Sequence, residues 1–280
     1  FFFKKNFERY LENKIVCVID SKYSKTDIND HYPNLKPVPI VNDLESAIQL
    51  KAEVLILGIA PSGGKVPSDW YPVIKMALSK GLSIINGLHD LLENRFKNLV
   101  SKKNQWIWDV RVPNFIPEIA TGKAAKLNNK RLLMVGTDMA CGKMTTALEI
   151  YSMARKKNIN CGFLATGQIG ITITGDGIPL DAFKVDHACG AVEQKILENS
   201  DKDLIVIEGQ GSILHPGSTA TLPLMRGSCP THIILCHRAE KENLRYPENI
   251  KIPTPKIIHF WSFILVAITG LRNMTGSIDN

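Results

Sequence analysis

The chain has 280 residues, of which 44% are hydrophobic and 22% charged, and its formal net charge is +7 at pH 7. This length and apolar content can bury a core in one large or two ordinary domains, which excludes an intrinsically disordered chain. Basic residues are scattered among acidic ones and no nucleic-acid-binding motif occurs, so we expect no nucleic-acid partner but a positive field that attracts small anions.

No targeting or membrane signal is evident from the pattern. Residues 1–5 lack the charged, apolar and small-residue regions of a signal peptide, and the apolar run at 260–268 is too short to cross a bilayer. The six cysteines form no Cys-x-x-Cys pair, which indicates buried thiols of a reducing compartment and neither disulfides nor a zinc site. We therefore predict a cytoplasmic protein without a membrane partner, and the missing initiator methionine predicts an incomplete N-terminus.

The N-terminal half alternates short apolar runs with helical segments. Three runs rich in β-branched residues predict buried strands, at 15–19, 54–58 and 83–86. Two helices are predicted between them, at 43–50 with Asn42 or Asp43 as the cap and at 70–80 with Gly81 at the end. This alternation predicts a parallel sheet covered on both faces, with ligand loops at 58–65 and 86–90. The first strand lacks a Gly-x-Gly-x-x-Gly loop, which argues against a nicotinamide dinucleotide.

A segment rich in Pro, Asn and Lys follows Pro113 and predicts a linker that ends near Lys130. We place the domain boundary there, with a first domain over residues 1–128 and a second over 129–280. Apolar runs of the second domain predict four strands, at 132–135, 162–166, 204–207 and 231–236. A helix is predicted at 186–198, with His187 and Glu193 on its surface.

The most informative stretch is residues 131–150 (RLLMVGTDMACGKMTTALEI). An apolar run stops at Gly136, a polar loop leads to Gly142 and Lys143, and apolar residues then recur at helical spacing. Strand, glycine loop and helix in that order are typical of a phosphate-binding loop, where backbone amides and a lysine face an anion. Five residues separate the two glycines, one more than in the common Walker A form, and Met144 replaces the usual hydroxyl residue. Cofactor contacts are expected from Gly136, Thr137, Asp138, Cys141, Gly142, Lys143, Met144, Thr145 and Thr146.

The other three strands of the second domain also end in small or polar residues. Their ends are Thr166 to Gly170, Glu208 to Ser212, and His237 with Arg238. Because the carboxyl ends of parallel strands share one edge, we expect these residues beside the phosphate loop. Glu208 has the place of the carboxylate that usually completes such a site. Further cofactor contacts are expected from Gly167, Gln168, Gly209, Gln210 and Gly211.

These motifs resemble two known families. Gly-Thr-Asp-x-x-x-Gly-Lys at 136–143, with a later strand ending in Glu-Gly-x-Gly, resembles dethiobiotin synthetase, a P-loop enzyme that uses MgATP. The fuller pattern resembles the D-glutamate N-acetyltransferase-like family, formerly a domain of unknown function, over residues 15–240. The motifs of this second resemblance are 58–65 (GIAPSGGK), 85–90 (INGLHD), 108–113 (WDVRVP), 136–146 (GTDMACGKMTT), 165–168 (ATGQ) and 208–216 (EGQGSILHP).

The second resemblance implies an α/β fold of two domains, a Rossmann-like parallel sheet followed by a P-loop NTPase-like parallel sheet. It also implies an N-acetyltransferase that uses acetyl-CoA and a small amino acid substrate of the D-glutamate type, and we expect a homo-oligomer. After Arg238 the chain departs from the family pattern and stops at Asn280, where further helices are expected. Truncation or a shifted reading frame after Arg238 would explain this departure.

Two other functions stay open, an ATP-dependent ligase or kinase and a non-catalytic nucleotide-binding regulator. Acetyl-CoA and MgATP both carry a pyrophosphate, so the loop does not choose between them. Met144 favours a phosphate contact without metal, and therefore acetyl-CoA. If magnesium is used, Thr145 and Glu208 are the expected ligands.

Acetyl transfer needs a base that takes a proton from the acceptor's ammonium group. His215 is the preferred candidate, with Glu208 or Asp138 as alternatives. Cys141 makes a covalent acyl-enzyme conceivable, although no base adjacent in sequence supports it. The carboxylate of a glutamate-like substrate is expected to contact Arg238, Arg111 or Lys65.

Overall fold

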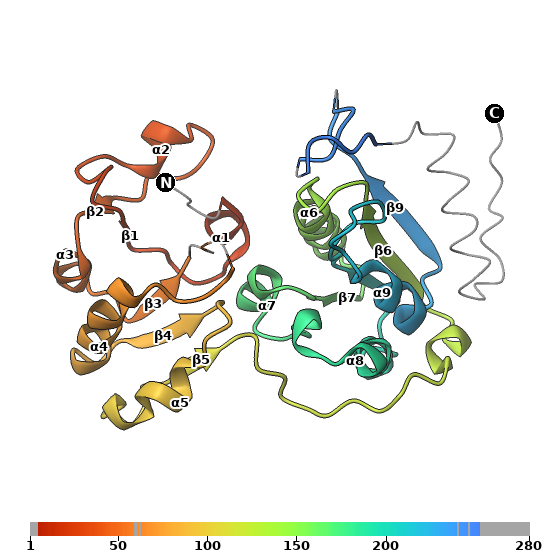
Figure 1. The fold of residues 1–280 in the computed structure, drawn as a ribbon, viewed down its shortest axis with the longest axis horizontal. Coiled ribbons are helices and arrows are strands. Elements are labelled where there is room, and N and C mark those ends of the chain that lie inside the picture. The colour runs from red at the N-terminus through yellow and green to blue at the C-terminus, as the bar shows by residue number, and fades with distance from the viewer. Residues whose placement is uncertain (1–4, 59–60, 62, 240, 246, 253–280) are drawn as a thin grey trace. The chain divides into compact units, whose positions relative to one another are not determined.

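The computed structural model describes residues 5–58, 61, 63–239, 241–245 and 247–252 (Figure 1). The chain divides into two compact units, Phe1–Val112 and Pro113–Asn280. Residues 113–128, which we expected at the end of the first domain, fall within the second unit by this division. The apolar run at 260–268, the start of the chain at 1–4 and the loop residues Ile59, Ala60 and Ser62 lie outside the described residues.

The first unit contains two parallel sheets. Strand β1 (Val18–Ile19) pairs with β2 (Ile40–Val41), and a second sheet has the order β3 (Val54–Leu57), β4 (Ser83–Asn86), β5 (Ile107–Asp109). The predicted run at 15–19 is therefore shorter as a strand, because two of its residues pair with β2. The helices of this unit are α1 (Lys5–Tyr10), α2 (Ile28–His31), α3 (Leu44–Gln49), η1 (Ser68–Trp70), α4 (Tyr71–Ser79), α5 (Leu92–Phe96) and η2 (Lys97–Leu99).

Helices α3 and α4 follow the signals in their sequences. The Asp43 side chain accepts a hydrogen bond from the Ser46 amide at 2.9 Å, as expected of an N-cap. In α4, Ile74, Ala77 and Leu78 are fully buried at the spacing of one helical face. Gly81 follows the helix with φ of 85°, a conformation that glycine adopts without a steric penalty.

The second unit is built on one parallel sheet of order β7 (Cys161–Leu164), β8 (Leu204–Ile207), β6 (Lys130–Gly136), β9 (His232–Cys236). Consecutive residues of β6 point to opposite faces of the sheet: Leu133 packs with α8 and α9, whereas Met134 packs with α6. Helices therefore cover both faces, and the α/β prediction of two parallel-sheet domains is confirmed. The helices are η3 (Lys123–Lys126), α6 (Lys143–Lys156), α7 (Gln168–Thr174), η4 (Leu180–Ala182), α8 (Val185–Glu198) and α9 (Thr221–Ser228).

Helix α7 is not predicted from the sequence, where residues 166–170 indicate only the end of a strand. Its residues are mostly β-branched or glycine, and such residues have low helix propensity. The Thr172 and Thr174 hydroxyls donate to the carbonyls of Gln168 and Gly170, four residues earlier, at 2.7 and 2.9 Å. Tertiary packing therefore stabilises a helix that local propensity disfavours.

The linker lies along α8 and buries Glu193. The Glu193 carboxylate accepts hydrogen bonds from the Thr121 amide at 2.7 Å and the Ala124 amide at 3.4 Å, and these amides lower its pKa. The His187 ring bonds the Pro117 carbonyl at 2.9 Å. The surface position expected for Glu193 is therefore wrong, because linker residues cover that side of the helix.

We expect Gly190→Ala to destabilise the protein, although alanine is the better helix former. A Cβ at position 190 would overlap the main-chain carbonyl of Glu118, which cannot rotate away as a side chain would. Such overpacking costs about 1–3 kcal/mol, more than the roughly 1 kcal/mol gained in helix propensity. Chemical denaturation should show this loss, while Gln194→Ala on the same helix should leave stability nearly unchanged.

The sequence predicts buried cysteine thiols and no segment that crosses a membrane. All six cysteines are free thiols, with Cys141 and Cys236 buried and the other four half-buried. Within the part of the chain that the structure describes, no helix has the length and apolar content needed to span a bilayer.

Candidate functional site

The predicted phosphate loop connects β6 to α6 in the middle of the second sheet. Strand β6 lies between β8 and β9, and its residues Leu133, Met134 and Val135 are buried. The helix begins at Lys143 after Gly142, whose φ of 101° is accessible to glycine and strained for other residues. The glycine therefore lets the chain turn from the loop into the helix with its first amides exposed to a ligand.

Lys143 is buried against the loop that precedes it. Its Nζ donates to the main-chain carbonyls of Asp138 at 2.8 Å and Met139 at 3.0 Å. Burial lowers the pKa of Lys143, and the neighbouring Cys141, Cys236 and Asp138 oppose this shift. Two glycines make room for the side chain: a Cβ at Gly136 would lie 2.9 Å from Nζ, and one at Gly209 would lie 2.9 Å from Cδ.

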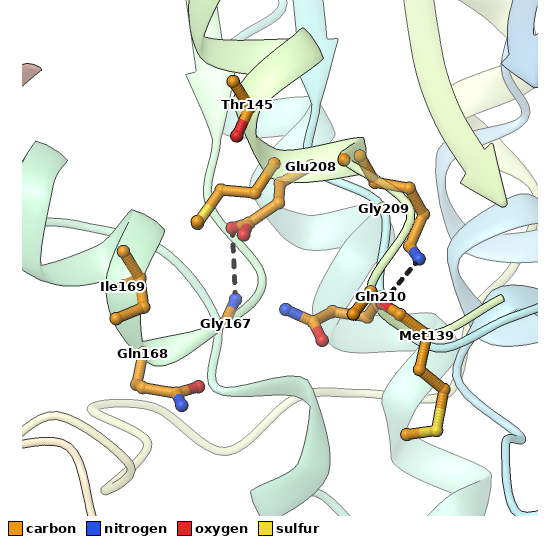
Figure 2. Close-up of a pocket in the computed structure, with 12 residues that line it drawn as sticks. Met139, Thr145, Gly167, Gln168, Ile169, Glu208, Gly209 and Gln210 are labelled. Atoms are coloured by element: carbon orange, nitrogen blue, oxygen red, sulfur yellow. Dashed lines mark hydrogen bonds between the residues drawn. The ribbon is translucent and has the colours of Figure 1, made fainter. Parts of the chain in front are cut away.

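Glu208 lies at the carboxyl end of β8 and is 2% exposed. Its Oε2 accepts hydrogen bonds from the amide of Thr166 at 2.8 Å and from the amide of Gly167 at 3.2 Å (Figure 2). A Cβ at Gly170 would overlap the same oxygen, so this glycine admits the carboxylate to the start of α7. Burial raises the pKa of Glu208 to about 7, because desolvation outweighs the two amides and the charge of Lys143.

Lys143 and Glu208 line one cavity of about 360 Å³ (Figure 2). Eight of the predicted cofactor contacts lie on its wall: Gly142, Lys143, Met144, Thr145, Gly167, Gln168, Gly209 and Gln210. The structure thus brings together residues from three strand ends, as the parallel arrangement required. The volume is at the low end for ligand pockets, so a molecule as large as acetyl-CoA must extend beyond it.

Sequence reasoning missed three lining residues, Met139, Ala140 and Ile169. Met139 and Ala140 belong to the predicted loop, and their position between the two glycines was the available signal. Ile169 gave no such signal because α7 itself was not predicted. In Figure 2 the Met139 side chain points away from Glu208.

The remaining predicted cofactor contacts are not among the residues that line this cavity. Thr137 Oγ1 bonds His237 Nδ1 at 2.9 Å, and Cys141 Sγ donates to the Asp138 carbonyl at 3.2 Å. The other cofactor contacts in this group are Gly136, Asp138, Thr146 and Gly211, and the catalytic candidate His215 is likewise absent from the lining. His215, the preferred base, is half-buried and its Nδ1 accepts from the Gly217 amide at 3.0 Å.

Asp138 fastens the back of the loop to the chain that follows β9. Its Oδ2 accepts from Arg238 Nη2 at 2.7 Å and from the Arg245 amide at 2.8 Å, and its Oδ1 accepts from the Met139 amide at 2.7 Å. Although burial opposes the shift, these amides and the charges of Arg238 and His215 lower the pKa of Asp138. A carboxylate held in this way is a weak proton acceptor.

We expect Asp138→Asn to lower the free energy of unfolding by about 1–3 kcal/mol at neutral pH, because Arg238 loses its charged partner. The folded-state pKa of Asp138 lies below its ordinary value of 3.8, so its stabilisation exists above that pH and is lost as pH falls further. The difference between wild type and Asp138→Asn should therefore shrink in acid. Asp203→Asn, at an exposed side chain, is the control, and an equal effect there would refute this role.

The three basic residues considered for a substrate carboxylate have separate positions. Arg238 is paired with Asp138 behind the loop. Arg111 belongs to the first unit, where its Nε donates to the Gly87 carbonyl at 2.8 Å, and Lys65 is exposed in the same unit. Among the described residues lining the cavity, the basic side chain is that of Lys143.

Magnesium ligands were expected from Thr145 and Glu208 if that ion is used. Both residues line the cavity, and Figure 2 shows the Thr145 hydroxyl pointing toward the side of the Glu208 carboxylate. Met144 lines the same cavity. Among the described residues, no group of three or more His, Cys, Asp or Glu side chains is arranged to hold a metal.

Two family models match the chain, one in each of the two units. The Rossmann-like DUF1611_N domain, a domain of unknown function, matches residues 21–113, and the DUF1611_C P-loop domain matches residues 118–264. The chain belongs to the DUF1611 family. A crystal structure of a DUF1611 family protein from Anabaena variabilis superposes with a TM-score of 0.88 and 43% identity, covering 93% of this chain and 77% of that one.

Two curated relatives of this DUF1611 chain are named D-glutamate N-acetyltransferase. The protein from a Pseudoalteromonas species is 40% identical over 203 residues, which is 71% of this chain and 60% of the relative. The protein from Tritonibacter scottomollicae is 38% identical over 214 residues, which is 75% of this chain and 64% of the relative. The match thus spans less than two thirds of the length of either relative.

Proposed function

We propose that this chain transfers the acetyl group of acetyl-CoA to the amine of D-glutamate or a similar D-amino acid. The observation that carries the proposal is that Lys143 and Glu208 line the same cavity. Lys143 and the loop amides offer a positive charge and donors to phosphate groups, and Glu208 offers a buried carboxylate to an ammonium group. The names of the two curated relatives support the same reaction.

The loop residues fit the diphosphate part of acetyl-CoA. Gly142 exposes the first amides of α6, and Lys143 supplies a positive charge beside them. The Lys143 ammonium already bonds two main-chain carbonyls, so phosphate oxygens would replace or share these partners. The small cavity volume leaves the rest of the cofactor on the surface.

Glu208 is the candidate base, in place of His215. It lines the cavity, and its pKa of about 7 lets it be ionised yet accept a proton near neutral pH. In the reaction, the ammonium proton moves to Glu208, and the amine nitrogen bonds the thioester carbonyl carbon. The carbon–sulfur bond then breaks as the nitrogen loses a second proton, and coenzyme A leaves as a thiolate that takes up this proton.

An ATP-dependent ligase or kinase is the second candidate, and the position of Thr145 favours it. Thr145 and Glu208 line the same cavity and are residue types that could hold magnesium beside a nucleotide phosphate. A regulator that binds nucleotide without chemistry would use the same residues. Ligand binding and turnover therefore have to distinguish these functions.

The test measures thermal stability with ligands and release of free thiol. We expect acetyl-CoA to raise the melting temperature in the presence of a chelator, and D-glutamate with acetyl-CoA to release coenzyme A thiol. Magnesium-dependent stabilisation by ATP, without response to acetyl-CoA, would overturn the proposal in favour of the ligase or kinase. Stabilisation by a nucleotide with no turnover of either substrate pair would favour the regulator.

A further inference from the structure

Two glutamine side chains lie on the cavity wall near Glu208. Gln210 follows Gly209 after β8, and Gln168 is the first residue of α7. Figure 2 shows both carboxamides below the Glu208 carboxylate, on the side opposite Thr145. Both residues are half-buried, and both belong to strand-end motifs that the reaction proposed above does not use.

The side-chain hydrogen bonds that the described part of the chain makes to these two residues do not involve their carboxamide groups. Among the described residues, the side-chain hydrogen bonds to these glutamines end on their main-chain carbonyls: Thr172 Oγ1 donates to Gln168 at 2.7 Å, and Thr221 Oγ1 donates to Gln210 at 3.2 Å. These bonds fix the backbone and leave each side-chain amide as two donors and an acceptor. Because both residues line the cavity, these donors and acceptors are available to a polar group that enters it.

Gly167 links the glutamines to Glu208. Its amide donates to Glu208 Oε2 at 3.2 Å, and a Cβ on this residue would overlap Gln210 Nε2. The same glycine thus holds the carboxylate and makes room for the carboxamide. Any side chain at position 167 would displace Gln210 from its place beside Glu208.

The Glu208 carboxylate and the neutral carboxamides of the two glutamines are complementary to the ammonium group and the α-carboxylate of an amino acid. The carboxylate carbon of an α-amino acid is two bonds from its amine nitrogen, so an acceptor whose ammonium group pairs with Glu208 presents its α-carboxylate to donors in the same cavity. A cationic side chain in place of the glutamines would pair with Glu208 and weaken it as a base, whereas a carboxamide donates without neutralising it. Lys143, the cation on the wall, is engaged by the loop where the phosphates are proposed to bind.

We propose that Gln168 and Gln210 bind the α-carboxylate of the acceptor amino acid while Glu208 binds its amine. This inference rests on the acetyl transfer proposed above, because it assigns the acceptor end of that cavity. It replaces the cofactor contact expected for both glutamines from the sequence. It also explains recognition of an amino acid without using Arg111, Arg238 or Lys65.

The test compares D-glutamate with 4-aminobutyrate, which has the same chain and amine but lacks the α-carboxylate. Binding is measured by calorimetry on wild type, Gln168→Leu and Gln210→Leu, because leucine keeps the side-chain size and removes the donors. Wild type should prefer D-glutamate, and each variant should weaken D-glutamate binding about 10-fold or more, as expected for hydrogen bonds to a charged group. Binding of 4-aminobutyrate and the KM for acetyl-CoA should stay unchanged.

Controls separate this inference from misfolding and from failure of the reaction. Gln194→Leu, on α8 outside the cavity lining, should bind both ligands as wild type does, and an unchanged KM for acetyl-CoA shows that the variants are folded. A higher KM for acetyl-CoA with unchanged D-glutamate binding would overturn the inference and return the glutamines to the cofactor. Equal binding of the two ligands by wild type would also overturn it. Absence of thiol release despite selective D-glutamate binding would refute the acetyl transfer alone.

Discussion

Replacing Glu208 with glutamine is expected to lower kcat by about 10²–10⁴-fold, the usual contribution of a general base. Glutamine keeps the side-chain shape, and its carbonyl oxygen can accept the Thr166 and Gly167 amides that Oε2 accepts now. It cannot take the proton of the acceptor's ammonium group. The loss should therefore appear in kcat, with a small change in the KM for acetyl-CoA.

The pH profile gives a sharper criterion for Glu208. A base must be deprotonated, so wild-type kcat/KM should rise as pH increases through about 7 and then level off. This rise should vanish in Glu208→Gln, whereas Glu53→Gln, at an exposed side chain of the first unit, should keep the wild-type profile. Retention of the rise in Glu208→Gln would assign the base to another residue, with His215 as the next candidate.

Protein stability should respond to the same group independently of activity. The folded-state pKa of Glu208 lies above its ordinary value of 4.5, so the folded protein binds the proton more tightly than the unfolded chain. Wild-type stability should therefore fall as pH rises from about 4.5 through 7, as this carboxylate becomes charged inside the protein. Glu208→Gln should lack this pH-dependent loss of stability. The melting temperature of the variant minus that of wild type should therefore be largest above pH 7.

Replacing Lys143 with alanine is expected to weaken acetyl-CoA binding by roughly 10- to 100-fold. The side chain is the cation on the cavity wall, and one charged hydrogen bond to phosphate contributes about 1.5–3 kcal/mol. Calorimetric titration with acetyl-CoA measures the loss directly. Inorganic pyrophosphate should compete with acetyl-CoA in wild type and compete poorly in Lys143→Ala.

Two further variants distinguish charge from packing at Lys143. Lys143→Met keeps most of the stem that packs beside Gly209, so it should retain more stability than alanine yet lose the same affinity. Lys156→Ala, at the exposed end of α6, should bind acetyl-CoA as wild type does. Undiminished binding by both position-143 variants would contradict the phosphate-binding role of this loop.

The loop at 136–143 contains residues that face the cavity and residues that anchor it to the rest of the chain. The cavity side presents Gly142 and Lys143 to a ligand, whereas the back is fastened through Asp138 to Arg238 and Arg245. These tasks are connected, because Asp138 Oδ1 holds the Met139 amide while the Asp138 and Met139 carbonyls accept from Lys143. Substitution of Asp138 should therefore lower the free energy of unfolding directly. It should alter ligand binding indirectly, by changing the position of the loop that carries Lys143.

Sequence alone determined the sheet and the ends of its strands. Strands β4 and β8 occupy the predicted residues, and β6, β7 and β9 differ from prediction by a few residues at their ends. Strands β4, β6 and β8 are mostly buried, so their apolar runs are bounded by glycine or polar residues, which is a local signal. Parallel order then places the loop at 136–143 and Glu208 at one edge, which is why most of the cavity was predictable.

Only the tertiary structure decided which polar side chains face that cavity. From sequence His215 was the preferred base, with Glu208 or Asp138 as alternatives. Burial raises the pKa of Glu208, whereas the Arg245 amide and the Arg238 charge, both 100 or more residues away, help to lower that of Asp138. Helix α7 and the burial of Glu193 likewise depend on contacts with segments distant in sequence. Hydration and charge at a site depend on everything packed around it, and a local pattern of residues does not contain that information.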